Sequence, residues 1–180
     1  MSKPANRKLS KREIVKRAAN IRLVLADNDG VMTDTGVYYS EQGEAFKRFS
    51  IRDGMGVERL REAGIETAII TGELSGSVRK RAEKLRLRHV YLGVRDKLAQ
   101  LQAIFQETGL SIEQLAYIGD DVNDLDALRA IRAFGLTAAP ADAMEEVRKS
   151  VHYNCKARGG DGAFREFAEL ILSSRGTHRS

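Results

Sequence analysis

The sequence predicts a single α/β domain with a doubly wound, mainly parallel, Rossmann-like sheet that carries helices on both faces. Short apolar runs alternate with helix-length segments along the chain, which is the pattern of successive strand-helix-strand units. Several of these runs end in Gly or Asp, as strands do where they turn into loops. The 180 residues, 42% of them hydrophobic, suffice for one buried core and are too few for two comfortable domains.

The first expected elements lie in the N-terminal third of the chain. A helix over residues 11–19 carries its apolar side chains on one face and leads into a buried strand near residues 22–27. Aromatic segments at 37–39 and 45–49 then flank a polar turn that contains Gly43. This arrangement predicts a β-hairpin that projects from the sheet.

Strands and helices alternate through the rest of the chain. Gly64 is the expected C-cap of the next helix, because glycine adopts the left-handed conformation without strain. The expected helices cover residues 54–63, 75–86, 96–107 and 124–131. The expected strands cover residues 67–70, 90–92 and 115–118, with short elements near 133–137 and 151–153 completing the sheet.

The chain is expected to comprise a basic extension with a short helix (1–20), a single folded domain (21–172) and a tail (173–180). Much of the formal net charge of +5 comes from the two ends, whereas a nucleic-acid-binding domain shows a basic stripe with aromatics on a folded face. Nucleic acid is therefore not an expected partner. A membrane is not expected either, because no apolar stretch is long enough to cross a bilayer. The lone Cys155 provides no disulfide framework, so a cytoplasmic protein is expected.

Three aspartates follow the first predicted strand. Asp27, Asp29 and Asp34 lie just beyond the apolar run, and carboxylates at the end of a parallel strand can hold a hard cation such as Mg²⁺. A solvated Asp-Gly turn is the alternative. A calcium-binding loop is disfavoured, because Gly30 stands fourth in the motif where that loop needs glycine at the sixth position.

Polar residues also follow two later strands, and parallel strands bring all these loops to one edge of the sheet. Such groups can bind a phosphoryl group, attack phosphorus through an aspartate and protonate the leaving alcohol through a second carboxyl. Each residue alone could instead end a strand, cap a helix or lie on the surface. The set comprises Thr71 and Gly72, Lys97 at a helix start, and Asp120, Asp121, Asn123 and Asp124.

In this order the residues resemble the haloacid dehalogenase superfamily of phosphohydrolases. The four matching motifs are 27–34, Thr71, Lys97 and 119–124, and the resemblance covers about residues 20–172. It implies that Asp27 is the nucleophile and that Asp29 is the general acid and then the general base. It also implies an Mg²⁺ cofactor held by Asp27, Asp120 and the main-chain oxygen of Asp29.

The same resemblance implies roles for the other motif residues. Thr71 and Lys97 would bind the phosphoryl oxygens, and Asp121, Asn123 and Asp124 would support the lysine or the metal site. Asn28 is a departure, because an apolar residue is common between the two aspartates in related phosphatases. Its side chain could alter local hydrogen bonding without removing a catalytic group.

The chain also resembles the capless phosphatases that act on 3-deoxy-2-keto sugar acids. Only a hairpin and single helices or strands fill the gaps between the motifs, and residues 33–34, 49–56 and 158–166 match this group. The group is tetrameric, with hairpins at the centre and a neighbouring subunit completing the substrate site. A homotetramer acting on a small sugar-acid phosphate is therefore expected.

Two branches of that group compete as models for the substrate. One branch acts on 2-keto-3-deoxynononate or N-acetylneuraminate 9-phosphate, and the chain resembles it at Glu73, Arg81, Lys84 and Asp161. At one hundred degrees per residue, the first three are expected on one helical face. Segment 52–54 resembles the branch that acts on 3-deoxy-D-manno-octulosonate 8-phosphate. We favour the nine-carbon substrate, with the octulosonate as the alternative. The expected substrate-binding residues are Asn28, Thr33, Asp34, Arg52, Gly72, Glu73, Arg81, Lys84 and Arg158.

An inactive binding or assembly module is the alternative from a different functional class, and a phosphate-responsive signalling domain is another. Loss of activity should leave a damaged nucleophile, lysine or metal site, and none is visible. The acid at Asp29 and the later aspartate cluster also suit turnover better than signalling.

Overall fold

The structure, a computed structural model, describes residues 9–175 and contains a six-stranded parallel sheet with the order β5-β4-β1-β6-β7-β8. The chain runs from β1 outward through β4 to β5 and then returns to β6 on the other side of β1. The topological switch point therefore lies at β1, where ligands bind in open α/β sheets. The strands are β1 (Leu23–Ala26), β4 (Glu66–Ile70), β5 (His89–Tyr91), β6 (Leu115–Ile118), β7 (Leu136–Ala139) and β8 (Tyr153–Asn154).

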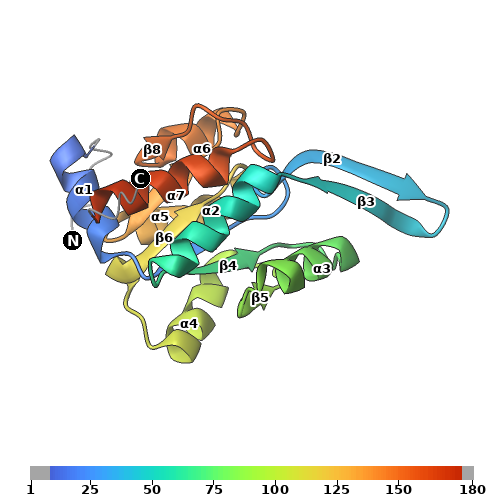
Figure 1. The fold of residues 1–180 in the computed structure, drawn as a ribbon, viewed down its shortest axis with the longest axis horizontal. Coiled ribbons are helices and arrows are strands. Elements are labelled where there is room, and N and C mark those ends of the chain that lie inside the picture. The colour runs from blue at the N-terminus through green and yellow to red at the C-terminus, as the bar shows by residue number, and fades with distance from the viewer. Residues whose placement is uncertain (1–8, 176–180) are drawn as a thin grey trace.

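Helices cover both faces of the sheet (Figure 1). Because both faces are covered, β1, β6 and β7 are buried along their whole length and consist mainly of apolar residues. One face is covered by α1 (Lys11–Asn20), α2 (Ile51–Glu62), α3 (Gly76–Leu85) and α7 (Ala163–Ser174). The other is covered by α4 (Lys97–Thr108), α5 (Leu125–Arg132) and α6 (Glu145–Ser150).

The predicted hairpin is longer than expected and projects from the body of the molecule (Figure 1). It consists of β2 (Thr33–Ser40) and β3 (Gly43–Phe49), which pair antiparallel with register shifts. Tyr38, Tyr39 and Phe46 are 65%, 73% and 71% exposed. The hairpin thus presents aromatic side chains to solvent, where a single chain gives them little to pack against.

Two helices were not predicted. The helix α7 presents Phe164, Phe167, Ala168 and Ile171 to the core, which is the one-face spacing of an amphipathic helix. The short helix α6 fills the connection before β8. The expected strand near 133–137 begins only at Leu136. Two short 3₁₀ helices, η1 (Ile112–Gln114) and η2 (Val122–Asp124), flank β6. These differences leave the predicted fold class unchanged.

The helix α1 packs against α7 and buries Ala18 in the core. Part of the predicted basic extension and most of the predicted tail, residues 1–8 and 176–180, lie outside the described residues, so the three-part division stays a prediction. Among the described residues, no helix is both long and apolar enough to cross a membrane.

The side chain of Asp53 joins α2 to the start of α7. It is fully buried and accepts hydrogen bonds from the backbone N–H groups of Gly162 (3.0 Å) and Arg165 (2.9 Å). The neighbouring Gly54 leaves room for Arg81, whose Nη2 atom would lie 2.4 Å from a Cβ at that position. Segment 52–54, which resembled the octulosonate branch, therefore has a packing role in this fold.

Candidate active site

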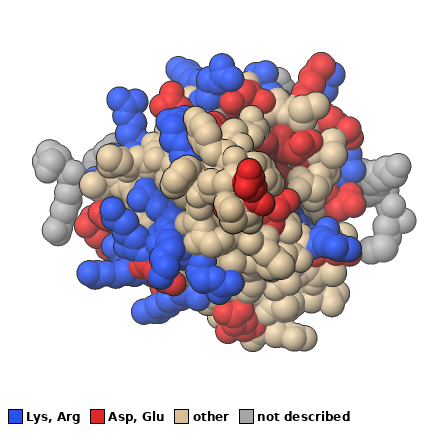
Figure 2. All heavy atoms as spheres, turned by 90° about the vertical axis from the view of Figure 1, so that its right-hand side faces the viewer, with Lys and Arg blue, Asp and Glu red and all other residues tan. Residues whose placement is uncertain are grey.

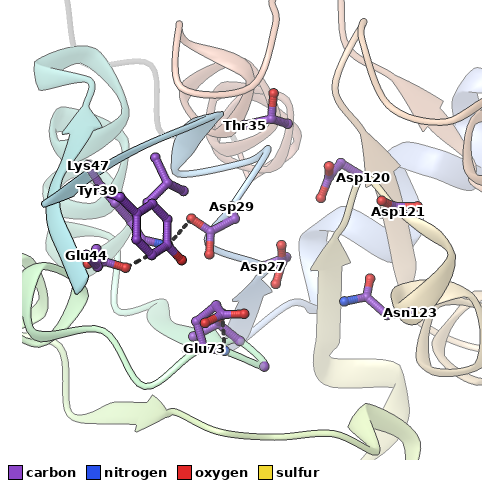
Figure 3. A pocket seen from close by; sticks show the side chains of 13 residues that line it. Asp27, Asp29, Thr35, Tyr39, Glu44, Lys47, Glu73, Asp120, Asp121 and Asn123 are labelled. Atoms are coloured by element: carbon purple, nitrogen blue, oxygen red, sulfur yellow. Dashed lines mark hydrogen bonds and ion pairs between the residues drawn. The ribbon is translucent and has the colours of Figure 1, made fainter. Parts of the chain in front are cut away.

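The loops after β1, β4 and β6 meet at the carboxyl edge of the sheet, and the hairpin lies beside them (Figure 3). Together they surround a cavity of about 300 Å³, which is at the small end of the range for ligand pockets. The lining residues are Asp27, Asp29, Thr35, Val37, Tyr39, Glu44, Lys47, Thr71, Gly72, Glu73, Asp120, Asp121 and Asn123.

Lys97 lies behind this cavity as the first residue of α4. Its Nζ atom is 2.6 Å from an oxygen of Asp27 and 2.6 Å from an oxygen of Asp124, and the side chain is 1% exposed. Burial opposes the charged amine, but the two carboxylates outweigh it and raise the Lys97 pKa above its ordinary value. The ammonium is therefore a fixed positive charge beside the predicted nucleophile.

Both carboxylate oxygens of Asp124 are occupied by hydrogen bonds. One accepts from Lys97 and from the buried Tyr117 hydroxyl. The other accepts from the backbone N–H groups of Asp120 (3.0 Å) and Asp121 (3.3 Å). Asp124 thus anchors the lysine and the loop after β6, as the resemblance implied for its supporting role.

Asp27 and Asp120 face each other across the same pocket. Burial, followed by neighbouring carboxylates, raises the pKa of Asp27 to about 7 and that of Asp120 to about 8. One Asp120 oxygen is buried without a hydrogen-bond partner in the described part of the chain. The single positive charge of Lys97 is therefore too small to offset the negative charge of these carboxylates when all are ionised.

These residues fit a bound hard cation. Oxygen atoms of Asp27, Asp120 and Asp124 all lie within 4.8 Å of one another, and carboxylate oxygens are the donors that Mg²⁺ prefers. Gly30 allows this approach, because a Cβ there would lie 2.0 Å from an Asp120 oxygen. Since Asp124 is already saturated, Asp27 and Asp120 are the side chains available to a metal.

Asp29 points away from this cluster and toward the hairpin. Its Oδ1 atom accepts hydrogen bonds from Lys47 of β3, from the Asn28 amide and from the Thr33 hydroxyl. Sequence analysis missed Lys47, along with Thr35, Val37, Tyr39 and Glu44. Nothing in the local pattern marks Lys47 as a site residue, because its partner lies 18 positions away in the chain.

The loop after β4 brings Thr71, Gly72 and Glu73 to the cavity. The helical-face argument for Glu73 is wrong, because Glu73 precedes α3, which begins at Gly76. Arg81 does not line the cavity of its own chain: it donates to the Ser50 backbone oxygen at 2.9 Å and lies over the Phe49 ring. Lys84 is exposed on α3.

The other predicted substrate-binding residues also lie outside the cavity lining of this chain. Thr33 and Asn28 are buried and bonded to Asp29, which gives them positions behind the site. The remaining three are at the surface or in ion pairs: Asp34 binds Arg48, Arg158 binds Asp142, and Arg52 is exposed at the start of α2.

The cavity lining is strongly acidic. Figure 2 looks at the hairpin end of the molecule and shows basic side chains gathered on the left, with acidic ones near the centre and upper right. The lining includes Lys47 as its cation, against the acids Asp27, Asp29, Glu44, Glu73, Asp120 and Asp121. An anionic ligand therefore needs further positive charge to enter.

Comparison with known proteins identifies close relatives. The chain is 41% identical over 160 residues to the 3-deoxy-D-manno-octulosonate 8-phosphate phosphatase KdsC of Yersinia pestis, covering 89% of this chain and 84% of the relative. No protein-family model matches the chain.

Solved structures agree with that relationship. The Moraxella catarrhalis 3-deoxy-D-manno-octulosonate 8-phosphate phosphatase, solved with a magnesium ion, a phosphate ion and a KDO molecule, superimposes with a TM-score of 0.86 at 36% identity, covering 92% of this chain and 93% of that one. A haloacid dehalogenase (HAD) superfamily subfamily III A hydrolase from Legionella pneumophila gives a TM-score of 0.87 at 34% identity, covering 92% and 89%.

Proposed function

Because the chain belongs to the KdsC family of 3-deoxy-D-manno-octulosonate 8-phosphate phosphatases within the haloacid dehalogenase superfamily, we propose that its substrate is 3-deoxy-D-manno-octulosonate 8-phosphate. The chain is a phosphoric monoester hydrolase. The observation that carries the reaction type is the buried contact of Lys97 with Asp27, beside Asp120 and at the switch point of the sheet.

In the proposed reaction an Asp27 oxygen attacks phosphorus, and the bond from phosphorus to the substrate alcohol breaks. Asp29 gives a proton to the departing oxygen, which is needed because an alkoxide is a poor leaving group. Asp29 then takes a proton from water as that water attacks the phosphorus of the aspartyl-phosphate. Inorganic phosphate leaves, and the Asp27 carboxylate is restored.

Other residues around Asp27 would stabilise the negative charge of the phosphoryl group. Lys97 and Thr71 would bind phosphoryl oxygens, and the position of Lys97 is fixed by Asp124 before substrate arrives. We propose that Asp27, Asp120 and the main-chain oxygen of Asp29 hold Mg²⁺, which would offset the negative charge of the phosphoryl group. Asp121 and Asn123, which line the cavity, would support that metal site.

The proposed substrate corrects the preference drawn from the sequence. The relatives that we compared carry the octulosonate name and give the nine-carbon reading no support. Glu73 also precedes α3 and so does not share a helical face with Arg81 and Lys84. The eight-carbon alternative is therefore the better reading. Glu73 keeps a proposed role, because it lines the open part of the cavity.

We further propose a homotetramer whose neighbouring subunit completes this site. The support is the projecting hairpin with its exposed aromatics, together with the acidic lining, in which Lys47 supplies less positive charge than a sugar-acid phosphate requires. Sedimentation velocity on the purified chain tests this directly. A chain that sediments as a monomer and still hydrolyses its substrate efficiently would contradict the proposed tetramer.

The test of the substrate is kcat/KM with Mg²⁺ for 3-deoxy-D-manno-octulosonate 8-phosphate, 2-keto-3-deoxynononate 9-phosphate and N-acetylneuraminate 9-phosphate under one set of conditions. That ratio reports differential transition-state binding. We expect the eight-carbon ester to be preferred by at least about tenfold, the factor that 1.4 kcal/mol of differential binding gives. Equal values, or a preference for a nine-carbon ester, would overturn the proposed substrate.

A further inference from the structure

The carboxylate of Asp29 is held by one of its two oxygens. Oδ1 accepts from the Lys47 ammonium, from the Asn28 amide at 3.1 Å and from the Thr33 hydroxyl at 3.2 Å. Oδ2 has no hydrogen-bond partner within residues 9–175. Figure 3 shows one oxygen turned to the hairpin and the other turned away from it. The single proton of the Thr33 hydroxyl can also go to the Asn28 backbone oxygen at 3.1 Å, so Lys47 and the Asn28 amide are the donors that fix the carboxylate. Oδ2 is left for a ligand.

Lys47 is the charged member of this set and cannot act as an ordinary surface lysine. Its side chain is 1% exposed, and its ammonium also lies 3.4 Å from an oxygen of Glu44. Glu44 in turn accepts from the hydroxyl of Ser75, which caps α3. Lys47 is therefore held between the hairpin, the loop after β1 and the start of α3 by its contacts with Asp29 and Glu44.

We propose that Lys47, helped by Asn28, is a positioning residue that aims the free oxygen of Asp29 at the leaving-group oxygen of the substrate. Proton transfer in the transition state depends on heavy-atom distance and alignment. A carboxylate released from Lys47 could rotate about its last side-chain bond and lose that alignment. This inference rests on the proposed function, because it assigns Asp29 the role of general acid.

The first test is the dependence of kcat/KM on the leaving group, since kcat/KM covers the steps up to release of the alcohol. A panel of alkyl and aryl phosphates is assayed with wild type, Lys47→Met and Lys47→Arg. Good leaving groups need little protonation, so Lys47→Met should lose about 10- to 100-fold on alkyl esters and less than about threefold on aryl esters. Lys47→Arg keeps a donor and should recover most of the alkyl activity.

The second test is a double-mutant cycle. If Lys47 acts through Asp29, then Lys47→Met in an Asp29→Asn background should cost less than about twofold on alkyl esters, because the group that it positions is already gone. Losses that multiply in the double variant would overturn the proposal. So would equal losses on alkyl and aryl esters in Lys47→Met alone.

Two further variants keep the test interpretable. Lys149→Met removes an exposed ion pair with Glu145, neither residue lines the cavity, and the panel should be unchanged. Asn28→Leu removes one neutral donor and should lower kcat/KM on alkyl esters about threefold, with a smaller loss on aryl esters. This variant tests the positioning role if Lys47→Met fails to fold. The panel contains no sugar acid, so a wrong substrate assignment would leave the selective loss on alkyl esters intact. An unchanged leaving-group dependence in Lys47→Met and Asn28→Leu would overturn only the positioning role.

Discussion

The two ends of the cavity are organised in opposite ways. The phosphate end, where we propose that the phosphoryl group binds, has Asp27 and Asp120 in the lining with Lys97 and Asp124 behind them. It is buried, and its lysine contacts two carboxylates at 2.6 Å each. The open end, comprising Tyr39, Glu44 and Glu73, is formed by the hairpin and a loop, and Tyr39 is 73% exposed. This difference supports the proposals that one chain preorganises the chemistry and that substrate recognition needs additional groups.

Electrostatics explains why the phosphate end must be rigid. Charges held in a dry, low-dielectric pocket act strongly on a phosphoryl group and need no reorganisation during the reaction. The open end has a more exposed wall, and under the proposed function it would recognise hydroxyl groups and a carboxylate that do not react. If this comparison is correct, substitutions at the phosphate end should affect every ester, and those at the open end should affect only sugar acids.

The largest effect is expected for Asp27→Asn. An amide cannot attack phosphorus, so kcat should fall at least about 1,000-fold for alkyl and aryl esters alike, as losing a nucleophile does elsewhere. Steady-state phosphate release measures this. Asp126→Asn on the exposed face of α5 is the matched control and should keep wild-type activity. Residual turnover near the wild-type rate would remove Asp27 from the mechanism.

Lys97→Met should damage both stability and activity. It leaves Asp27 and Asp124 buried without their cation, which costs about 3 to 5 kcal/mol when one partner of a buried ion pair is removed. Urea unfolding in EDTA measures the loss. We expect Mg²⁺ to restore part of it by supplying positive charge at Asp27 and Asp120. A variant as stable as wild type would show that the buried contacts carry little free energy.

Glu73→Ala should separate the two ends of the cavity. We expect about a tenfold loss of kcat/KM on the sugar-acid phosphate, in line with the loss of one charge-assisted hydrogen bond, and no change on p-nitrophenyl phosphate. Glu83→Ala, which removes an exposed glutamate on α3, is the control. A uniform loss on both esters would mean that Glu73 supports the site as a whole.

The smallest effect on activity is expected for Tyr117→Phe. The hydroxyl lies behind the cavity and donates to Asp124, so its removal should cost about 2 kcal/mol of unfolding free energy, typical of a buried hydrogen bond to a charged group. The kcat should fall less than about fivefold, because Lys97 still holds Asp27. Chemical denaturation and phosphate release test the two parts. A loss of activity as large as that of Lys97→Met would place Tyr117 in the chemistry.

The parallel fold and the phosphate end follow from the amino-acid sequence alone. Apolar runs that end in Asp or Thr can be recognised locally, and parallel strands necessarily bring their ends to one edge, so the sequence suffices to place Asp27, Thr71 and Asp120 together. Glu73 was wrongly counted on the face of the helix that carries Arg81 and Lys84, because that helix begins only at Gly76. Sequence analysis also missed α7, although the apolar spacing of that helix is regular.

The hairpin side of the site depends instead on tertiary packing. Lys47 meets Asp29, Glu44 meets Ser75 and Asp53 caps α7, yet these partners stand 18, 31 and 109 positions apart. No local pattern marks such pairs, because the partners come together only when separate elements pack against one another. Motifs at strand ends are set by local backbone geometry, whereas contacts between distant elements depend on how those elements pack.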